Sequence, residues 1–457
     1  MSEEFDAVVA RVRDRVTPTP EERDRLDSVV ADLTDRTERT LADLPVDGEV
    51  VLAGSTARDT WLAGDRDVDL FVAFPPDLDR ERLAEYGLAV GHAVLPGGHE
   101  EYAEHPYVVG EHDGFEVDLV PCYAVEDATA IQSAVDRTPF HSQYLESRID
   151  GDIAAEIRVC KQLFTGIGVY GSDLRTRGFS GFLTELLVLE HGGFRPLVEA
   201  AADWHPPVEF DPEGHGKATF DDPLVVVDPT DPGRNVAAVC STENVARLQH
   251  YARDLLADPR VGLFEPADPD PIDPDGVREA IADRGTTPVA VRFDAPDVVE
   301  DQLWPQLEKS RDGIAGELDR RGFDVFRSAA FATDTSGTSA GDVALLFELA
   351  VSERPQVEYH AGPPVHAREH ATGFCEKYAG TDAYGPFLDG ERYVVERDRE
   401  YASARVFLES DAIFDVALGA HVESELEAGY DLLVGDEVAT LAEPFGSGLA
   451  GYFVPEP

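Results

Sequence analysis

Apolar residues in the first part of the chain follow a helical and then a strand pattern. Thr19 precedes Pro20 and Glu22, an arrangement typical of a capped helix start. Apolar positions then recur every three or four residues, which predicts a helix ending near Leu44. Short apolar or alternating runs predict strands at residues 50–53, 67–74, 108–109 and 115–120, the last two joined by a turn at Asp113-Gly114.

The helical spacing returns in the middle of the chain and gives way to a second group of strands. Helices are expected at residues 154–164, 180–191 and 242–256, and a short strand at 224–227. The order strand, helix, strand, strand then opens a ferredoxin-like unit, at residues 289–293, 304–321, 323–333 and 342–350. One more helix is expected at residues 364–378.

These elements predict an α+β protein with several domains, and a length of 457 residues suits about three. Residues 1–148 are expected to form a head of mixed strands and helices. A mostly helical neck, or central domain, is expected at residues 149–285. Residues 286–457 are expected to form a ferredoxin-like body with a tail inserted at about 355–405.

The composition is extremely acidic. The chain has 38 lysines and arginines against 91 aspartates and glutamates, a formal net charge of −53. Only four of the basic residues are lysines, and the acidic residues are spread along the whole chain. Molar salt shortens the Debye length to ~3 Å and screens the self-repulsion of such a chain. The composition therefore indicates an extreme halophile as host, and it says little about what the protein binds.

The cysteines and the apolar runs bear on the compartment. Cys122, Cys160, Cys240 and Cys375 have neither metal-finger spacing nor the pattern of a disulfide framework. The first residues are acidic, unlike a signal peptide, and no apolar run approaches the length of a membrane span. The sequence therefore predicts a cytoplasmic protein with free thiols and no membrane association.

Two closely spaced carboxylates are the main chemical signal. Asp67 and Asp69 stand two positions apart on an expected strand, so their side chains share one face. Such a pair repels itself unless a cation lies between, and Mg²⁺ prefers oxygen ligands and leaves room for phosphates. Asp118 on another strand would complete a site for two metals about 4 Å apart, and could act as base on an attacking hydroxyl. Gly54 would let a triphosphate approach the backbone, and Ser55 offers it a hydroxyl.

An Asp-x-Asp pair alone is weak evidence, because a solvated surface explains it equally well in so acidic a chain. The combination is more specific: Gly54-Ser55, then Asp67 after eleven intervening residues, then a strand-borne Asp118. Together these features favour a site for nucleotidyl transfer.

This pattern resembles the DNA polymerase β superfamily, and longer segments resemble the archaeal (class I) CCA-adding tRNA nucleotidyltransferases. The similar segments are GSTARDTWL at 54–62, RTPFH at 137–141, YG at 170–171, RGFSGF at 177–182, DPTDPGRNVA at 228–237, and GPPV at 362–365 with REH at 368–370. Their order matches over essentially the whole chain. The chain departs from the family at Thr56, where an aromatic residue is common, and at Asp67, where Glu is common; either carboxylate can bind Mg²⁺.

The resemblance implies a polymerase-β-type nucleotidyltransferase head and assigns roles to single residues. Asp67, Asp69 and Asp118 would bind Mg²⁺ in a two-metal site, and Arg234 would help to read the base. The residues implied to contact the triphosphate or the rest of the incoming ATP or CTP are Ser55, Arg58, Thr138, His141, Lys161, Tyr170 and Ser180.

The chemistry of these residues agrees in part. Lys161 is retained in a chain that has almost abandoned lysine, and an ammonium suits a contact to phosphate. Tyr170 could stack on a base or sugar, and His141 could donate to a phosphate. Each of the three is also explained by ordinary packing or surface exposure, so the sequence leaves both interpretations open.

The resemblance implies that the protein adds C, C and A to the 3′ end of tRNA from CTP and ATP, without a nucleic-acid template. The acceptor stem and TΨC arm would be held mostly by shape and backbone. One alternative is a poly(A) polymerase or an oligoadenylate-synthetase-like enzyme, which shares the carboxylates. The other is a catalytically silent RNA-binding module on this fold. Whether the protein is a monomer or a homodimer stays open.

Overall fold

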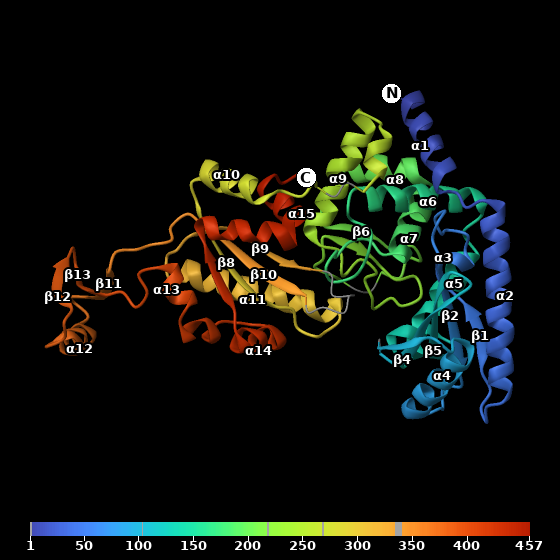
Figure 1. Cartoon of the computed structure of the whole chain (residues 1–457), viewed down its shortest axis with the longest axis horizontal. Coiled ribbons are helices and arrows are strands. Elements are labelled where there is room, and N and C mark those ends of the chain that lie inside the picture. The colour runs from blue at the N-terminus through green and yellow to red at the C-terminus, as the bar shows by residue number, and fades with distance from the viewer. Residues whose placement is uncertain (1, 103, 217–218, 267–268, 334–340) are drawn as a thin grey trace. The chain divides into compact units, whose positions relative to one another are not determined.

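The computed structural model describes residues 2–102, 104–216, 219–266, 269–333 and 341–457 (Figure 1). The chain divides into two compact units, with the boundary between residues 267 and 268. Both units combine helices with sheets, so the predicted α+β multidomain class is confirmed. None of the helices in the described residues is both long and apolar enough to span a membrane.

A five-stranded sheet organises the N-terminal part of the first unit, in the order β1-β2-β5-β4-β3. Its central pair, β2 and β5, is parallel, and the other neighbours are antiparallel. The expected turn at Asp113-Gly114 is confirmed, because both residues have positive φ, 55° and 79°, between β4 and β5. The strands are β1 (Glu49–Leu52), β2 (Asp67–Phe74), β3 (His99–Tyr102), β4 (Pro106–His112) and β5 (Phe115–Tyr123).

Helices cover this sheet and continue into the middle of the chain. The helix predicted from Thr19 to about Leu44 is confirmed as α2, and Thr19 forms the expected capping box with Glu22. The apolar pattern does not predict α4, because Gly87 and Gly91 interrupt it; both glycines lie against β-strand side chains that a Cβ would strike. The helices of this N-terminal part are α2 (Pro20–Ala42), α3 (Gly54–Ala57), α4 (Arg80–Val94) and α5 (Arg137–Glu146).

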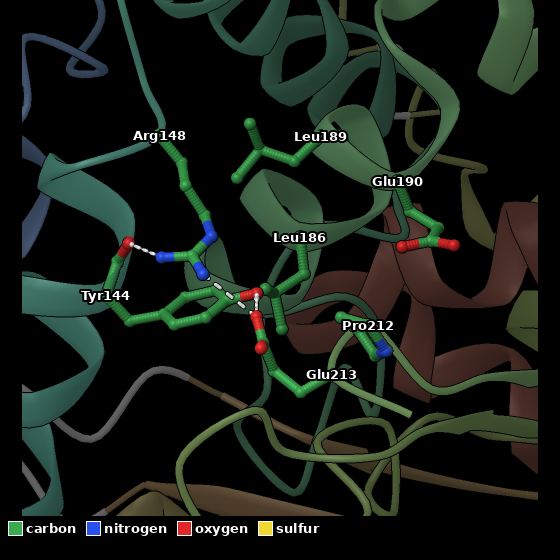
Figure 2. A pocket seen from close by; sticks show the side chains of 7 residues that line it. All are labelled: Tyr144, Arg148, Leu186, Leu189, Glu190, Pro212 and Glu213. Atoms are coloured by element: carbon green, nitrogen blue, oxygen red, sulfur yellow. Dashed lines mark hydrogen bonds and ion pairs between the residues drawn. The ribbon is translucent and has the colours of Figure 1, made fainter. Parts of the chain in front are cut away.

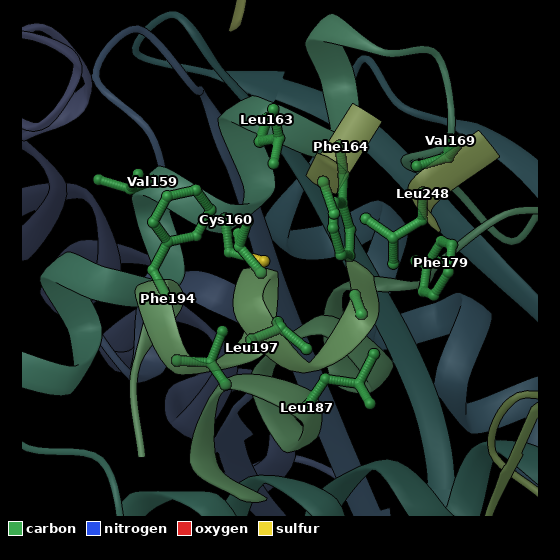
Figure 3. Packing of buried hydrophobic residues seen from close by; sticks show 14 of the residues in the cluster. Val159, Cys160, Leu163, Phe164, Val169, Phe179, Leu187, Phe194, Leu197 and Leu248 are labelled. Carbon is green, nitrogen blue, oxygen red and sulfur yellow. The ribbon is translucent and has the colours of Figure 1, made fainter. Parts of the chain in front are cut away.

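The middle of the chain is mostly helical and has its own apolar core (Figure 3). The first helix, α1 (Ser2–Val16), packs into this core, where Phe5 stacks on Phe194 with ring centroids 6.1 Å apart. The helices expected at 154–164, 180–191 and 242–256 are confirmed as α6, α7 and α9. The remaining elements are α6 (Gly151–Gly166), α7 (Gly181–His191), α8 (Phe194–Ala202), β6 (Val208–Phe210), β7 (Leu224–Val226) and α9 (Thr242–Ala257).

The second unit contains a four-stranded antiparallel sheet in the order β14-β8-β10-β9. Numbered along the chain, this is the 4-1-3-2 order of a ferredoxin-like fold, as the sequence predicts. Helices α11 and α14 pack on one face, and α10 with α15 on the other. The elements are α10 (Pro274–Arg284), β8 (Thr287–Asp294), α11 (Glu300–Arg320), β9 (Val325–Ala332), β10 (Asp342–Leu349), α13 (Ala404–Leu408), α14 (Ala420–Ala428), β14 (Asp431–Val434) and α15 (Ala442–Phe453).

A small three-stranded sheet with one helix interrupts this unit. Its strands are β11 (Val357–Pro364), β12 (Tyr384–Asp389) and β13 (Arg392–Asp398), and its helix is α12 (Arg368–Tyr378). The helix expected at residues 364–378 thus begins four residues late, because Pro364 still pairs in β11 with Arg392. Short 3₁₀ turns lie at Ala128–Ala130, Ala134–Asp136, Val261–Phe264, Asp411–Asp415 and Gly435–Leu441.

Candidate active site

The parallel strands β2 and β5 bring two of the three predicted carboxylates together. Asp69 and Asp118 are direct partners in the strand register, and Asp67 lies opposite Glu116. Asp69 and Asp118 are half-buried, whereas Asp67 is exposed. Strand alternation turns the apolar neighbours of these residues into the core, so the acidic side chains share the other face.

The crowded carboxylates resist ionisation. Burial, together with the nearby charges of Asp69 and Glu116, raises the pKa of Asp118 to about 7. Burial also raises the pKa of Asp69, with a second contribution from Asp67 that Arg58 opposes. Two facing carboxyls with raised pKa values form a place where a cation would relieve repulsion.

The donor set fits a hard divalent cation in chemistry, though not as a closed cage. No group of three or more His, Cys, Asp or Glu side chains in the described residues is arranged to hold a metal by itself. Mg²⁺ is usually bound through one or two carboxylates and completed by water and substrate phosphates. Asp69 and Asp118 can supply those two carboxylates, with Asp67 at the rim of the same face.

Gly54 and Ser55 form the first turn of α3, beside Asp69. Gly54 has φ of 70°, and a Cβ built on it would lie 1.8 Å from Oδ2 of Asp69. The backbone therefore reaches the carboxylate as closely as only glycine permits. The Ser55 carbonyl accepts the backbone N–H groups of Arg58 and Thr60, which folds the chain back beneath the short helix.

A buried ionic cluster lies behind this turn. Lys161 is 3 % exposed, and its Nζ lies 3.1 Å from each of three acceptors: the carbonyl and hydroxyl oxygens of Thr60 and Oε1 of Glu185. Arg58 is 7 % exposed, with Nε 3.0 Å and Nη2 2.9 Å from Oε2 of Glu185. Its Nη1 donates to Oγ of Ser142 on α5. Lys161 can reach a phosphate only by leaving one of its present acceptors, whereas some N–H groups of Arg58 make no hydrogen bond to the residues that the structure describes.

A second cluster centres on the buried carboxylate of Asp228. Its Oδ2 accepts hydrogen bonds from Nε2 of His141 at 2.8 Å and from Nη1 of Arg234 at 2.9 Å, and its Oδ1 accepts from Thr230. Burial would raise the pKa of Asp228, but the hydrogen bonds from His141 and Thr230 hold it well below the usual range. Burial lowers the pKa of His141, so a neutral imidazole donates to an ionised carboxylate. The ring of His141 stacks on Phe182 with centroids 3.8 Å apart.

Three more predicted residues lie around these clusters with less specific contacts. Tyr170 is half-buried, and burial together with the charge of Glu185 raises its pKa. The Ser180 hydroxyl caps α7 by accepting the backbone N–H of Leu183. Thr138 lies on α5 one turn before His141, and it is also half-buried.

A cavity of about 350 Å³ opens one turn farther along α5 and α7 (Figure 2). The Tyr144 hydroxyl donates to Glu213 at 2.8 Å, and Arg148 donates to the same oxygen at 2.9 Å. The guanidinium carbon of Arg148 lies 3.7 Å from the centroid of the Tyr144 ring. The lining residues are Tyr144, Arg148, Leu186, Leu189, Glu190, Pro212 and Glu213.

Four of the residues that organise the two clusters received no role from the sequence: Glu185, Ser142, and Asp228 and Phe182, which lie in the quoted motif segments. One signal was available, because Glu185 is a charged residue in an otherwise apolar helix, and glutamate is almost never fully buried unless it is paired. The hydroxyl of Ser142 and the ring of Phe182 give no such signal, since both depend on how α5 and α7 pack.

Three family models match successive parts of the chain. The nucleotidyltransferase domain matches residues 35–141, and the second domain of tRNA nucleotidyltransferase matches residues 155–265. The C-terminal domain of CCA-adding enzyme matches residues 284–435. Together with the opposed carboxylates beside a glycine turn, these matches define the protein class as a nucleotidyltransferase.

Full-length relatives narrow this class. The CCA-adding enzyme of Haloarcula marismortui is 64 % identical over 466 residues, covering 100 % of both chains. That of Halobacterium salinarum is 56 % identical over 98 % of this chain and 99 % of the relative, and that of Methanosarcina barkeri 38 % over 94 % of each. The chain belongs to the family of CCA-adding enzymes. The first two relatives come from halophilic archaea, which agrees with the acidic composition.

The chain also has a more distant similarity to solved structures. A poly(U) polymerase bound to MgATP matches with a TM-score of 0.47 at 14 % identity, covering 58 % of this chain and 100 % of that chain.

Proposed function

We propose that the protein adds C, C and A to the 3′ end of tRNA, using CTP and ATP without a nucleic-acid template and releasing pyrophosphate. The observation that supports this mechanism most directly is the register pairing of Asp69 with Asp118 beside Gly54. Membership of the CCA-adding family indicates tRNA as the substrate, and the shared face of the carboxylates indicates nucleotidyl transfer as the reaction.

Asp69 and Asp118 would hold Mg²⁺, with Asp67 reaching the same cations from the exposed start of β2. Bound there, two Mg²⁺ ions would activate the tRNA 3′-hydroxyl and stabilise the leaving pyrophosphate. The chain itself orients the carboxylates by strand register and keeps apolar side chains beneath them. Asp118 would also act as base on the attacking hydroxyl, because a raised pKa makes its carboxylate a stronger base than an ordinary aspartate.

The nucleotide would lie between the carboxylates and the two clusters. Gly54 and Ser55 would face the triphosphate, and Arg58 would donate to it from the edge of the ionic cluster. His141 and Arg234 would contact the incoming nucleotide, with Arg234 nearest the base, because both are fixed by Asp228. Four further residues would surround the nucleotide, some in contact with it and others farther away: Thr138, Lys161, Tyr170 and Ser180.

The second unit would hold the tRNA. We propose that the chain has three domains. They are a head at residues 1–148, a neck at 149–285, and a body at 286–457 with its inserted tail. The ferredoxin-like body and tail would bind the acceptor stem and TΨC arm through shape and backbone, as double-stranded RNA is commonly bound. We place the enzyme in the cytoplasm, where its substrate is matured.

The test is a single-nucleotide addition assay. The protein is incubated at molar KCl and with Mg²⁺ with tRNA that lacks its last three nucleotides, and with CTP, ATP, UTP or GTP alone or in pairs. Two additions from CTP, and a third only when ATP is also present, would support the proposal. Unlimited addition of A from ATP alone would refute it and indicate a poly(A) polymerase instead.

A further inference from the structure

Glu185 is a carboxylate fully enclosed within the first unit. Its side chain is 0 % exposed, in the middle of α7. Oε2 faces the Nε and Nη2 atoms of Arg58, and Oε1 faces Nζ of Lys161 and the hydroxyl of Thr60. One acidic side chain on α7 therefore holds groups from the loop after α3 and from α6.

The loop that carries Arg58 has a backbone conformation that needs outside support. Asp59 has φ of 53°, the left-handed region that non-glycine residues rarely adopt. Its carboxylate is held by Arg23 through two contacts of 3.0 Å, and Arg158 donates to its carbonyl oxygen. Glu185 fixes the residues on both sides of this position, Arg58 and Thr60. The loop is thus tied down at each of three consecutive residues.

The charges of the cluster also depend on Glu185. Arg58 and Lys161 bring two positive charges into a buried region, and Glu185 supplies a negative charge in contact with both. The cluster keeps one net positive charge near the carboxylate site, where the charge of Arg58 opposes the repulsion between Asp67 and Asp69. Without a carboxylate at position 185, two buried like charges would face each other, and the side chains would have to move apart.

We propose that Glu185 is a positioning residue for the incoming nucleotide: it holds the Arg58 guanidinium at the angle needed to meet the triphosphate, while Lys161 locks the same carboxylate against Thr60. Glu185 does not itself touch the nucleotide. This inference rests on the proposed function, because it takes Arg58 as a triphosphate contact. It adds the element that makes that contact rigid, and preorganised donors cost less to use than donors that must be ordered at each binding event.

Glu185→Gln tests this, because the amide keeps the shape but removes the charge that orients Arg58. We expect KM for CTP and for ATP to rise about tenfold with kcat changed by less than about threefold, the signature of lost ground-state binding. The inhibition constant of inorganic pyrophosphate should rise in parallel. That of cytidine, which lacks phosphates, should stay within about twofold, since a role confined to phosphates leaves nucleoside binding alone.

Glu348→Gln is the matched control. Glu348 is also a buried carboxylate, and it accepts from Arg284 at 2.5 and 2.9 Å and from the Thr286 hydroxyl at 2.6 Å. It lies in the second unit, so its loss should lower the melting temperature without changing KM for CTP. Equal rises of KM in both variants would overturn the proposal, because they would indicate a general loss of rigidity in the protein.

A double-mutant cycle with Arg58→Ala asks whether Glu185 acts through Arg58. In the Arg58→Ala background, Glu185→Gln should change KM for CTP by less than about twofold; an effect as large as in the wild type would overturn the proposal. If Glu185→Gln does not fold, Glu185→Asp decides, because its shorter side chain cannot reach both cations. A rise of KM and of the pyrophosphate constant in Glu185→Asp supports the proposal, and unchanged values refute it. Wild-type protein that fails to extend tRNA would instead refute the proposed function.

Discussion

Asp69 and Asp118 lie directly opposite each other on neighbouring parallel strands, and each is half-buried. The pairing comes from two segments almost fifty positions apart in sequence, whose apolar residues fill the core beneath. Burial raises the pKa of both carboxyls, and the charge of Asp67 adds to the rise at Asp69, as that of Asp69 does at Asp118. The carboxylates that catalysis needs therefore lower the stability of the sheet at this point, since an apolar pair would hold the strands together more favourably.

One contribution to the pH dependence of stability comes from Asp118, because burial raises its folded-state pKa to about 7. An unfolded aspartate titrates near pH 4, so the folded protein holds this proton more tightly. The stability from this group is fully present below about pH 4 and is lost as the pH rises through about 7. In EDTA, the melting temperature of wild type should fall relative to that of Asp118→Asn between these values. Parallel curves for the two proteins would contradict this assignment.

Removal of one opposed carboxylate should abolish catalysis without unfolding the sheet. In Asp69→Ala we expect kcat to fall by about a thousandfold or more, because metal-assisted charge stabilisation is worth several kcal/mol. Single-turnover addition of the first C measures this. Glu49→Ala is the control, since Glu49 is exposed at the far end of β1, opposite Ala73. Similar losses in both variants would argue against a metal role for Asp69.

The glycine next to Asp69 can be tested against a glycine in open space. Gly54 and Gly64 both have positive φ, 70° and 96°, so an alanine strains either backbone by about 1 kcal/mol. Only at Gly54 does the new Cβ strike Oδ2 of Asp69, whereas nothing lies within 4 Å at Gly64. We expect Gly54→Ala to lose nearly all addition activity and Gly64→Ala to lose stability alone. Activity retained by Gly54→Ala would refute a close approach at this site.

Base selection should depend on Asp228, which holds both His141 and Arg234. In Asp228→Asn, the preference for CTP over UTP in the first addition should fall about tenfold, because Arg234 loses its charged anchor. The ratio of kcat/KM values for the two nucleotides measures it. Asp231→Asn provides the comparison, since Asp231 pairs with Arg137 at 3.1 Å in the same loop. An unchanged ratio in Asp228→Asn would show that the Asp228 cluster has no role in base selection.

The acidity of the chain predicts an unusual salt response. At molar salt the counterion-release contribution to RNA binding nearly vanishes, so stacking and direct hydrogen bonds must carry more of the affinity. We expect the affinity for tRNA to depend only weakly on KCl. Filter-binding or fluorescence titrations over the molar range measure this slope. A steep loss of affinity with added KCl would contradict the prediction.

The local pattern predicts strands and helices where one residue class dominates. Residues 67–74 and 115–120 alternate or run apolar, so both strands are predicted, and their carboxylates with them. The pattern does not reveal that these two strands are parallel neighbours, because pairing is decided by contacts between distant segments. It also misses α3, since four residues beginning with Gly54 have no helical periodicity, and their conformation is set by the fit against Asp69.

The candidate site shows the same division. Motif comparison supplied Arg58, Lys161 and His141, but it treated each as a separate contact to the nucleotide. The structure groups Arg58 and Lys161 around Glu185, and it places His141 on Asp228. These ion-pair partners depend on which helices pack together, and the pattern of a single sequence does not predict that packing.

The packing of α1 among the central helices has a consequence for synthesis on the ribosome. Phe5 emerges first, but the ring on which it stacks, Phe194, belongs to α8. At ordinary translation rates the apolar face of α1 must wait about ten seconds or more for its partner. During that interval the nascent chain exposes an amphipathic segment to the cell, and α1 can pack only after the central helices have been made.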